Sequence, residues 1–266
     1  MRRVGIIAGE GRLPLIAAKE LKKQAYDIVV VCIVSGLKKS LKEIANKVYE
    51  IEIGKIGEII DTLNLHEVKD LVMLGKVKKQ ILYQDIVLDE KTISLLSKIK
   101  NKSDDTILKA IVEELEKEGI FVVDQTKYLK RLLPSKGVLS ERKPNLRENE
   151  DINYGWEMAK GIAGLDIGQT VIVKEKAVVA VEAIEGTDKA ILRAGEIAGA
   201  DAVVVKVSKP QQDFRFDVPT VGINTMESII EAKARVLAIE SGKTLVVHKE
   251  EMIALANKFG IVFTVI

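Results

Sequence analysis

Short apolar runs alternate with amphipathic stretches along the whole chain. Val4–Ala8 and Asp27–Ile33 are typical of buried strands, and between them a helical spacing of apolar residues begins near Leu13-Pro14, where proline suits the first turn. The alternation continues through residues 48–74 with a strand, a helix and a strand. Strands separated by helices at this spacing predict right-handed βαβ units on a parallel sheet, and therefore an α/β fold.

Further helices and one strand are expected before the middle of the chain. Apolar residues at helical spacing occupy residues 81–99, and their faces either pack on the core or stay open to a lipid chain. A second helical pattern follows Ser103-Asp104-Asp105, and Ile120–Val123 is a strand. Helix capping explains one aspartate at this start, and the alternative for Asp105 is a paired role in a site.

Residues 132–153 carry many Pro, Gly and charged side chains with little periodicity, as is typical of a connection between domains. We therefore expect domains over residues 1–133 and 134–266, with the linker at about residues 132–150. The second half has an α/β pattern of its own. Its expected elements are helices at Asp151–Gly164, Lys189–Gly199, Thr225–Ser241 and Lys249–Phe259, and strands at Val171–Lys174, Val178–Glu182, Ala202–Val207, Thr244–Val247 and Ile261–Ile266.

The composition is that of a globular protein and argues against several classes of function. The 266 residues include 41 basic and 39 acidic side chains, a balance that argues against a nucleic-acid clamp and makes any anion site local. No apolar run approaches the roughly 18 to 20 residues that span a bilayer. We therefore expect no nucleic-acid partner and no transmembrane segment.

The few cysteine and histidine residues limit the possible metal and catalytic sites. Together with the first residues of the chain they also indicate the cellular compartment. Cys32 is the single cysteine, so a disulfide framework or a thiolate metal cluster is ruled out. His66 and His248 are far apart in the sequence, which disfavours a histidine metal site or a His-dependent triad. The chain begins with a strand and a glycine turn, in place of the apolar segment of a signal peptide. A cytoplasmic protein is the expectation.

Two loops of the first half are candidate phosphate sites. Gly9-Glu10-Gly11 separates the first strand from the first helix, where glycine lets backbone N–H groups approach an anion. This loop lacks the third glycine of the dinucleotide fingerprint, and Val34-Ser35-Gly36 offers no acidic residue for a ribose. NAD binding is therefore disfavoured, and a plain tight turn is an equal alternative. Gly75–Lys79 would lie at the same sheet edge, where its lysines either bind phosphate or form a solvated cluster.

The densest chemistry lies in Ala202–Gly222, where an apolar strand runs into charges of both signs. A solvated loop with surface ion pairs is the simple explanation, but α/β proteins bind ligands at the carboxyl ends of strands. If the sheet is mostly parallel, this loop converges with Gly168-Gln169 and Glu182–Asp188. Carboxylates without histidine or cysteine suit Mg²⁺ or Mn²⁺, and neighbouring bases suit a diphosphate. The acids are Glu182, Glu185, Asp188, Asp213 and Asp217, and the bases are Lys206, Lys209 and Arg215.

Six segments carry a resemblance that spans nearly the whole chain. They are IAGEGRLP at Ile7–Pro14, Gly75-Lys76-Val77, SDDTILKAI at Ser103–Ile111, GLDIGQTVIV at Gly164–Val173, VEAIEGTDKAILRAG at Val181–Gly195 and VVVKVSKPQQDFRFDVPTVG at Val203–Gly222. In these segments the sequence resembles the LpxI-type UDP-2,3-diacylglucosamine pyrophosphatases of lipid A biosynthesis. It departs from that family at Lys79-Gln80, where Arg-Pro is expected, and at Ser103 and Gln211, where glycine is usual.

The resemblance implies an N-terminal Rossmann-like parallel-sheet domain, a distinct C-terminal α/β domain, and a substrate cleft between them. It implies metal-dependent hydrolysis, with Mg²⁺ or Mn²⁺, of UDP-2,3-diacylglucosamine to UMP and 2,3-diacylglucosamine 1-phosphate (lipid X). The family's essential aspartate falls on Asp217 or, as second choice, Asp213, and the expected metal ligands are these two and Glu182. The expected substrate-binding residues are Gly11, Leu13, Gly75, Lys76, Asp105, Gln169, Thr187, Asp188, Lys206, Lys209, Gln212 and Arg215.

Two other functions stay open, a hydrolase of another nucleotide-sugar diphosphate and a non-catalytic nucleotide-binding regulator. Asp213 and Asp217 favour an enzyme over a binding regulator, because adjacent acids repel a phosphate unless a metal intervenes. The expected partner is a lipid-linked nucleotide sugar. A homodimer and transient contact with the inner membrane surface are both compatible with the resemblance.

Overall fold

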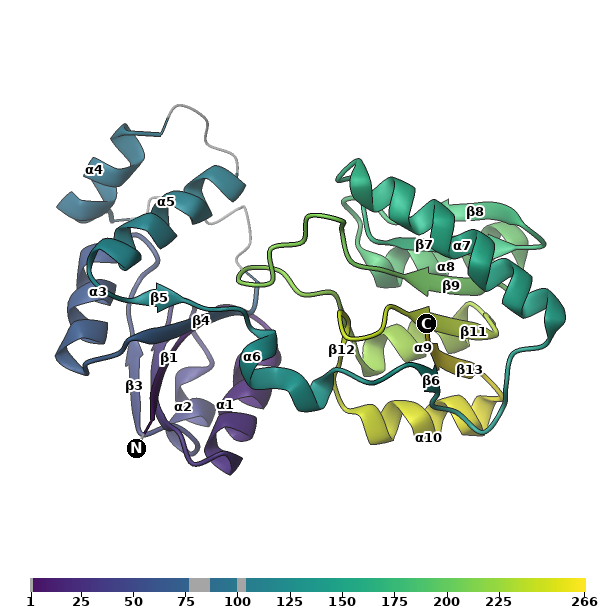
Figure 1. Cartoon of the computed structure of the whole chain (residues 1–266), viewed down its shortest axis with the longest axis horizontal. Coiled ribbons are helices and arrows are strands. Elements are labelled where there is room, and N and C mark those ends of the chain that lie inside the picture. The colour runs from purple at the N-terminus through teal and green to yellow at the C-terminus, as the bar shows by residue number, and fades with distance from the viewer. Residues whose placement is uncertain (1, 77–86, 100–103) are drawn as a thin grey trace. The chain divides into compact units, whose positions relative to one another are not determined.

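The computed structural model describes residues 2–76, 87–99 and 104–266 (Figure 1). The predictions for residues 77–86 and 100–103, including Lys79-Gln80, and the Asp105 side chain lie outside that description. The chain forms a first unit, Met1–Leu129 with Phe214–Phe216, and a second unit, Lys130–Asp213 with Asp217–Ile266. Each unit has its own sheet and helices, which confirms the predicted α/β class and two-domain architecture. No described helix is long and apolar enough to cross a membrane.

A parallel sheet forms the centre of the first unit. Its described elements are β1 (Arg3–Ala8), α1 (Leu13–Lys23), β2 (Asp27–Cys32), α2 (Lys38–Lys42), β3 (Lys47–Glu50), α3 (Ile56–Leu65), β4 (Asp70–Leu74), α4 (Glu90–Ser97), α5 (Asp104–Lys117), β5 (Phe121–Val122) and α6 (Thr126–Leu129). The strands pair in the order β3-β2-β1-β4-β5, all parallel. β1 and β2 are apolar along almost their whole length because helices cover both faces of such a sheet.

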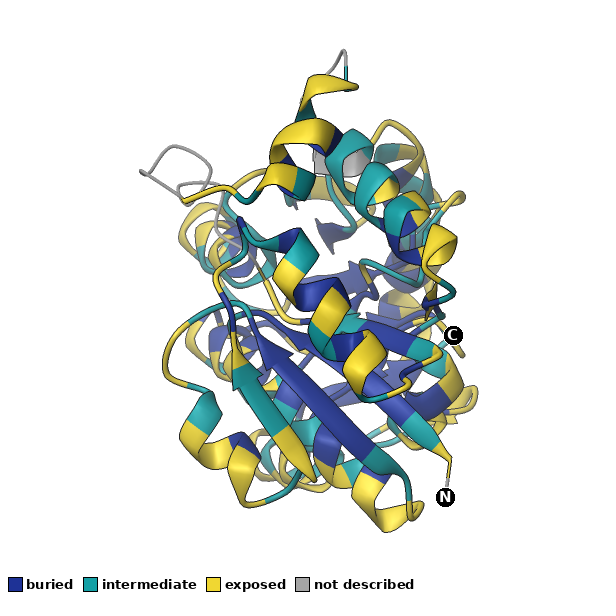
Figure 2. Ribbon diagram, turned by 90° about the vertical axis from the view of Figure 1, so that its left-hand side faces the viewer, coloured by how far each residue is buried: buried dark blue, intermediate teal, exposed yellow. Residues whose placement is uncertain are grey.

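The core of the first unit lies between this sheet and its helices. Ile59, Ile60 and Leu63 on α3 and Leu115 on α5 form one apolar cluster with strand residues such as Val31. Figure 2 shows the pattern, with dark blue strands and helices that turn exposed yellow faces outward. Helical spacing of apolar residues therefore correctly identified the faces that pack inward.

Phe214–Phe216 complete the first unit although they come from late in the sequence. The backbone N–H of Gln125 donates to Phe214 O at 3.0 Å, and its side-chain Nε2 donates to Met73 O at 2.8 Å. Gln125 is only 2% exposed. The Phe216 ring packs against the apolar cluster of α3 and α5. These three residues therefore supply both core packing and hydrogen bonds to the first unit.

The second unit has a mixed sheet. Its elements are the 3₁₀ turn Lys130–Leu132, β6 (Gly137–Val138), α7 (Leu146–Gly164), β7 (Thr170–Lys174), β8 (Ala177–Val181), α8 (Thr187–Ala198), β9 (Val203–Lys206), β10 (Thr220–Val221), α9 (Ile223–Glu231), β11 (Val236–Ile239), β12 (Leu245–Val246), α10 (Lys249–Phe259) and β13 (Val262–Val265). The main sheet has the order β6-β13-β11-β9-β7-β8, and β10 pairs with β12 separately. One face is covered by α7 and the other by α8, α9 and α10, as their separate apolar clusters show.

The expectation of a mostly parallel second sheet is correct for β9, β11 and β13 and wrong for β6, β7 and β8. β7 runs antiparallel to both β8 and β9, and β6 runs antiparallel to β13. The β7–β8 turn has positive φ at Glu175 (51°) and Lys176 (57°), as a tight two-residue hairpin requires. The buried Asp151 carboxylate accepts both backbone N–H groups of that turn, at 2.9 and 2.7 Å. A side chain on α7 thus fixes the hairpin.

The predicted helix Thr225–Ser241 is wrong in its second half. α9 ends at Glu231, Lys233 has φ of 55°, and β11 begins at Val236. All four residues of β11 are fully buried because the strand lies between β9 and β13 with helices on both faces. An apolar run of this length has the same composition in a buried strand as in a helix.

The two predicted glycine loops of the first unit are paired, and Gly75 lies at their closest approach. Lys76 N donates to Glu10 O at 2.9 Å and Glu10 N donates to Lys76 O at 2.7 Å, so the loop after β1 pairs with the loop after β4. Gly75 has φ of +90°, and a Cβ atom there would lie 2.6 Å from Glu10 O. Both the conformation and the close approach therefore require glycine at this position.

Replacing Gly75 with alanine should cost more stability than the same change at Gly36. Gly36 has a similar φ of +99° but no atom within 4 Å of its virtual Cβ, so Gly36→Ala should lower the free energy of unfolding by about 1–2 kcal/mol through backbone strain. Gly75→Ala adds a steric overlap with backbone and should cost about 2 kcal/mol more. Denaturant unfolding monitored by circular dichroism measures both, and equal losses would contradict the close approach.

Candidate functional site

Three loops of the second unit meet at one sheet edge, as the sequence predicted. Val207 N donates to Gln169 O and Glu182 N donates to Thr170 O, each at 2.9 Å. Because β7 is antiparallel to its neighbours, the residues before β7 lie beside those after β8 and β9. The convergence is therefore correct, and it depends on antiparallel pairing in place of the parallel arrangement assumed from the sequence.

A buried lysine lies at the centre of this edge. Lys206, the last residue of β9, is 6% exposed. Its Nζ donates to Thr187 Oγ1 at 2.7 Å and to Thr170 Oγ1 at 3.5 Å, and it lies 3.9 Å from Glu182 Oε2. Thr187 Oγ1 in turn donates to Glu182 Oε1 at 2.7 Å. Lys206, Thr187 and Glu182, all predicted site residues, thus form one hydrogen-bonded cluster with Thr170.

Glu182 is held ionised by this cluster. Burial by itself would raise the pKa of its carboxyl, but the Lys206 ammonium and hydrogen bonds from Thr170, Thr187 and the Gln169 N–H outweigh that effect. The net result is a pKa below the ordinary value. At neutral pH the cluster therefore contains a compensated pair of opposite charges.

The amino end of α8 lies directly beside the cluster. Thr187 is its first residue, and Gly186 at the N-cap has φ of 86° and open space around its virtual Cβ. No side chain caps this helix end. Asp188 in the first turn accepts a hydrogen bond from Thr225 Oγ1 at 2.9 Å. The helix end and the neighbouring Lys206 together favour an anion at this edge.

The loop after β9 is folded onto the same edge through glutamine side chains. Gln169 Nε2 donates to Asp217 Oδ2 at 3.1 Å, and Gln212 Nε2 donates to Asp217 O at 2.9 Å and to its Oδ2 at 3.3 Å. Lys209 N donates to Gln212 Oε1 at 3.1 Å, and Asp217 N donates to Asp213 O at 3.2 Å. Asp217 is exposed, so its carboxylate is oriented by two amides while facing solvent.

Lys209 and Arg215, two of the predicted diphosphate contacts, have different surroundings. Lys209 forms an ion pair with Asp166, just after α7. Arg215 belongs to the first unit, where its guanidinium lies 3.9 Å from a carboxylate oxygen of Glu116 and 5.0 Å from the centre of the Phe216 ring. Arg215 is therefore carried by the first unit and Lys209 by the second.

The predicted metal ligands have separate partners in the described structure. Among the described residues no group of three or more His, Cys, Asp or Glu side chains is arranged to hold a metal ion. Glu182 is engaged with Lys206 and Thr187, and Asp217 is engaged with Gln169 and Gln212. The three predicted carboxylates are thus not gathered into one site. One or two carboxylates completed by substrate phosphate oxygens still suit Mg²⁺, so the metal remains a prediction.

Four predicted residues of the first unit lie after the carboxyl ends of β1 and β4, namely Gly11, Leu13, Gly75 and Lys76. Gly11 has φ of +100° with nothing within 4 Å of its virtual Cβ, and Leu13 begins α1, whose N-cap has no side-chain hydrogen bond. Gly75 and Lys76 form the paired loop described above. The open backbone at this helix start is the feature that the glycine pattern predicted.

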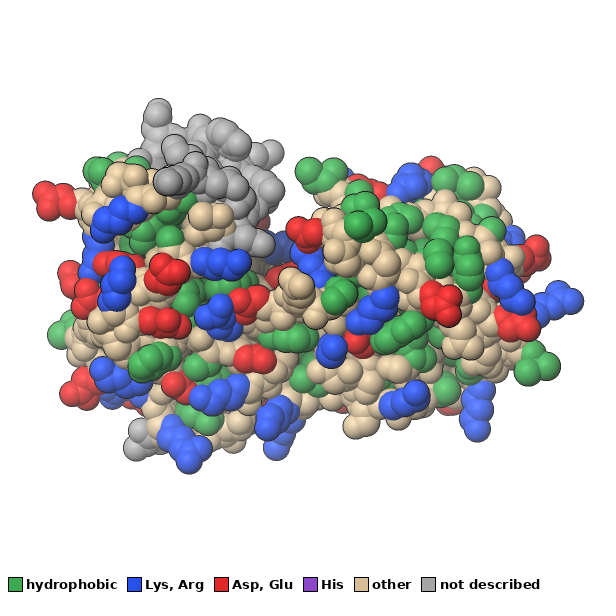
Figure 3. All heavy atoms as spheres, turned by 45° about the horizontal axis from the view of Figure 1, so that its top comes forward, with side chains coloured by type: hydrophobic (Ala, Val, Ile, Leu, Met, Phe, Trp, Pro, Cys, Tyr) green, Lys and Arg blue, Asp and Glu red, His purple; other side chains and the backbone are tan. Residues whose placement is uncertain are grey.

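Charge on the surface is mixed in sign. On the face shown in Figure 3, blue Lys and Arg side chains are interspersed with red Asp and Glu side chains. This distribution agrees with the near balance of 41 basic and 39 acidic residues. Attraction for an anion therefore depends on local groups such as Lys206.

Sequence reasoning missed two residues that shape this edge. Thr170, fully buried, is the hydroxyl shared by Lys206 and Glu182, and its only signal was a polar residue at the start of an apolar strand. Glu240, 6% exposed, follows β11 and was hidden because that segment was predicted as helix.

The fold and this edge define a two-domain α/β protein with a buried lysine beside an uncapped helix end. The chain belongs to the LpxI family. The family models match its N-terminal domain over residues 3–132 and its C-terminal domain over residues 135–264. The UDP-2,3-diacylglucosamine pyrophosphatase LpxI of Caulobacter vibrioides is 29% identical over 272 residues, which cover 98% of this chain and 96% of that protein.

Similarity to solved structures is weak. UDP-glucose-4-epimerase from Stenotrophomonas maltophila matches with a TM-score of 0.31 and 14% identity over 45% of this chain and 35% of that one. Glycinamide-RNase-transformylase T from Mycobacterium tuberculosis matches with a TM-score of 0.26 and 14% identity over 69% and 44%. Matches at this level carry no argument about function.

The lowered pKa of Glu182 predicts a specific acid sensitivity. A carboxyl whose pKa is lower in the folded than in the unfolded protein stabilises the fold above its ordinary pKa of 4.5, and this stabilisation is lost as pH falls through the folded value. The wild-type free energy of unfolding should therefore fall more steeply from pH 5.5 to pH 3.5 than that of Glu182→Gln. Urea unfolding across this range measures both slopes.

The matched control is Glu250→Gln, which removes an exposed carboxylate on α10. This variant should retain the wild-type slope. A Glu182→Gln slope equal to that of the wild type would contradict the charge compensation inside the cluster.

Proposed function

We propose that the protein is a UDP-2,3-diacylglucosamine pyrophosphatase that releases UMP and 2,3-diacylglucosamine 1-phosphate in lipid A biosynthesis. Membership of the LpxI family and the activity for which the Caulobacter vibrioides relative is named support this function. The structural observation that carries it is the buried Lys206 beside the uncapped start of α8, with Asp217 oriented on the same edge. A cation, helix N–H groups and a solvent-facing carboxylate are the parts that diphosphate hydrolysis needs.

Each group has a proposed role. Lys206 and the start of α8 bind phosphate oxygens and stabilise the charge that develops when the bridging P–O bond breaks. A water oxygen forms the new bond to phosphorus, and Asp217, held by Gln169 and Gln212, orients that water. The bridging oxygen leaves with the other phosphate. Lys209 provides a further phosphate contact, and Arg215 is likewise a proposed phosphate contact.

We further propose that Asp217 and Asp213 hold Mg²⁺ or Mn²⁺ together with substrate phosphate oxygens. The support is the residue chemistry, since acidic side chains beside a phosphate site repel the ligand unless a cation lies between them. Asp213 O accepts the Asp217 N–H at 3.2 Å, so the two residues belong to one turn. When bound, the cation would neutralise phosphate charge. Glu182 is a proposed outer ligand whose present contacts are Lys206 and Thr187.

The acylated sugar is proposed as the substrate because of the relative's name and one feature of the edge. Ile184, in the loop between β8 and α8, is fully exposed two residues from Glu182. An apolar side chain beside a phosphate site suits a ligand that carries both acyl chains and a diphosphate. A homodimer and contact with the inner membrane surface are further proposals that follow from family membership alone.

The alternatives are a hydrolase of another nucleotide-sugar diphosphate and a non-catalytic nucleotide-binding regulator. Purified protein should release UMP from UDP-2,3-diacylglucosamine at least tenfold faster than from UDP-glucose. Product analysis by mass spectrometry and phosphate chromatography measures both reactions. Equal rates on the two substrates would contradict specificity for the acylated sugar. If neither substrate is hydrolysed, the non-catalytic regulator is favoured. In the same assay, activity that persists in excess EDTA would contradict the proposed dependence on a metal ion.

Asp217→Asn should abolish turnover while substrate still binds. The amide keeps the size of the side chain but removes the charge that orients water, so a loss of about 100-fold or more in kcat is expected with binding within a few-fold of wild type. The control is Asp61→Asn, an exposed aspartate on α3. Near-normal turnover by Asp217→Asn would transfer the role to Asp213, which the corresponding Asp213→Asn variant tests.

A further inference from the structure

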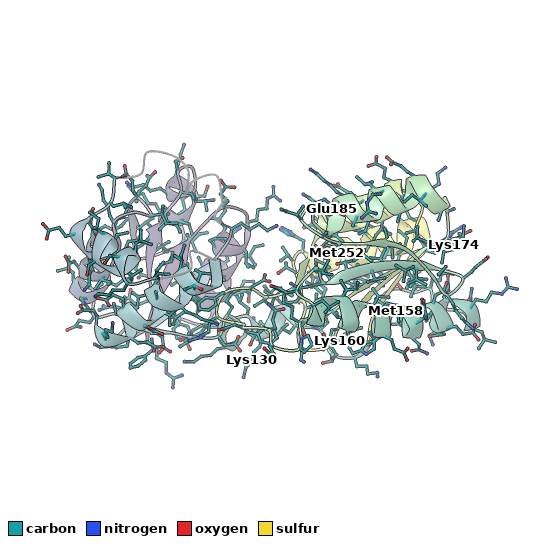
Figure 4. All side chains as sticks on the ribbon, turned by 90° about the horizontal axis from the view of Figure 1, so that it is seen from above. Lys130, Met158, Lys160, Lys174, Glu185 and Met252 are labelled. Carbon is teal, nitrogen blue, oxygen red and sulfur yellow. The ribbon has the colours of Figure 1, made fainter. Side chains whose placement is uncertain are left out.

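A second ion pair, between a partly buried lysine and a buried carboxylate, lies in the same unit, on the opposite side of the chain that follows β9. Lys160 on α7, labelled in Figure 4, donates from Nζ to both carboxylate oxygens of Glu240, at 2.8 and 2.7 Å. Glu240 follows β11 and is 6% exposed. Lys243 lies 3.3 Å from the same carboxylate, at the surface. The Trp156 ring lies 5.0 Å from Lys160 Nζ.

The Glu240 carboxylate binds the chain between Lys206 and Lys209. Glu240 Oε2 accepts the Ser208 N–H at 2.7 Å and the Ser208 hydroxyl at 2.8 Å, and Lys160 Nζ donates to Ser208 O at 3.0 Å. Ser208 is fully buried. The backbone N–H, the hydroxyl and the carbonyl of one loop residue are thus all satisfied by this ion pair.

This contact extends the β9–β11 pairing beyond the last paired strand residue. Ile239 is paired with Lys206 at the end of the ladder, and Glu240 N donates to Lys206 O at 3.1 Å. If the β9–β11 ladder continued, a backbone carbonyl of the β11 chain would accept the Ser208 N–H. The Glu240 side-chain carboxylate accepts it instead. On the other side, Val207 N donates to Gln169 O at 2.9 Å. The backbone from Lys206 to Ser208 is therefore held from both sides.

An ion pair with a buried carboxylate is an expensive way to satisfy one backbone N–H, because Glu240 loses most of its hydration and the partly buried Lys160 loses some. Burial opposes ionisation of Glu240, but hydrogen bonds from Lys160 and Ser208 outweigh it and keep the pKa of this carboxyl below its ordinary value. Replacing such pairs with apolar residues is often neutral or favourable for stability. Stability alone therefore does not account for the pair, whereas fixing the direction of one loop does.

We propose that Glu240 is a positioning residue that fixes Ser208, and through it the separation and direction of Lys206 and Lys209 at the phosphate-binding edge. The inference rests on the proposed function. Glu240 contacts Ser208, Lys160 and Lys243. It therefore acts through the loop, and Lys206 and Lys209 contact the substrate. Loss of the carboxylate acceptor leaves Ser208 N–H without a partner in a buried place, and the loop moves to satisfy it.

Two double variants separate positioning from stability. Lys160→Met/Glu240→Leu removes the charges and the acceptor, and Lys160→Met/Glu240→Gln removes the charges but retains a side-chain oxygen that accepts from Ser208. Positioning predicts that the leucine variant loses about 10- to 100-fold in kcat/KM and that the glutamine variant recovers most of this loss. Thermal unfolding of both variants is measured in parallel, and activity is assayed well below the lower of the two melting temperatures so that lost stability does not lower turnover. Equal activities in the two would overturn the proposal.

Amide hydrogen exchange of a peptide spanning residues 203–213 gives a readout independent of turnover. Exchange should be faster in the leucine variant and near wild type in the glutamine variant, and unchanged exchange in both would also overturn the proposal. If the wild-type protein does not hydrolyse UDP-2,3-diacylglucosamine, the proposed function fails while this exchange experiment still decides whether Glu240 fixes the loop. If the leucine variant does not fold, Glu240→Asp replaces it, since a side chain shorter by one methylene retains the charge but loses its reach to Ser208 N.

The matched control is a different ion pair of the second unit, which likewise joins a partly buried base to a buried carboxylate. Arg142 donates to Glu148 Oε1 at 2.5 Å, and Glu148 forms the capping box with Asn145 at the start of α7. Arg142→Met/Glu148→Gln should reduce stability and leave kcat/KM and exchange of residues 203–213 unchanged. A loss of activity in this control equal to that of the leucine variant would show that any such ion pair in the unit affects turnover, and would overturn the specific role of Glu240.

Discussion

A cation at the end of a fully buried strand is the constraint on which the second unit depends. Lys206 follows Val203, Val204 and Val205, all with 0% exposure, so its ammonium must find partners within the protein. Thr187 and Glu182 supply them, which draws the start of α8 and the end of β8 to the carboxyl end of β9. Compensation of one charge thereby joins the loop between β8 and α8 to the end of β9.

The same constraint explains why the edge suits an anion. Lys206 already has a carboxylate and a hydroxyl near it, so the cation is stable without a ligand. The open helix end at Gly186 offers further N–H groups without moving the chain. A phosphate bound here, as proposed, would meet groups already in position, and such preorganisation reduces the entropy lost on binding.

Element types were largely predictable from the sequence, because apolar periodicity records which face is buried. α10 and the paired loops at Gly9 and Gly75 follow directly from pattern and glycine placement. The antiparallel β7 and the strand β11 were not predictable, because strand direction and the choice between buried strand and helix depend on tertiary neighbours. Within the site, charged residue types indicated Lys206 and Glu182, whereas Glu240 lay in a misassigned helix, and Arg215 was grouped with lysines that belong to the other unit.

The contribution of Phe214–Phe216 to the first unit has a consequence for dissecting the protein. A polypeptide that stops at Leu129 contains every described strand of the first sheet but lacks the Phe216 ring from its apolar cluster. It also leaves the Gln125 N–H, in a residue only 2% exposed, without the Phe214 carbonyl. The domain boundary visible in the sequence is therefore not a boundary at which the folded chain can be cut, since a late segment completes an early domain.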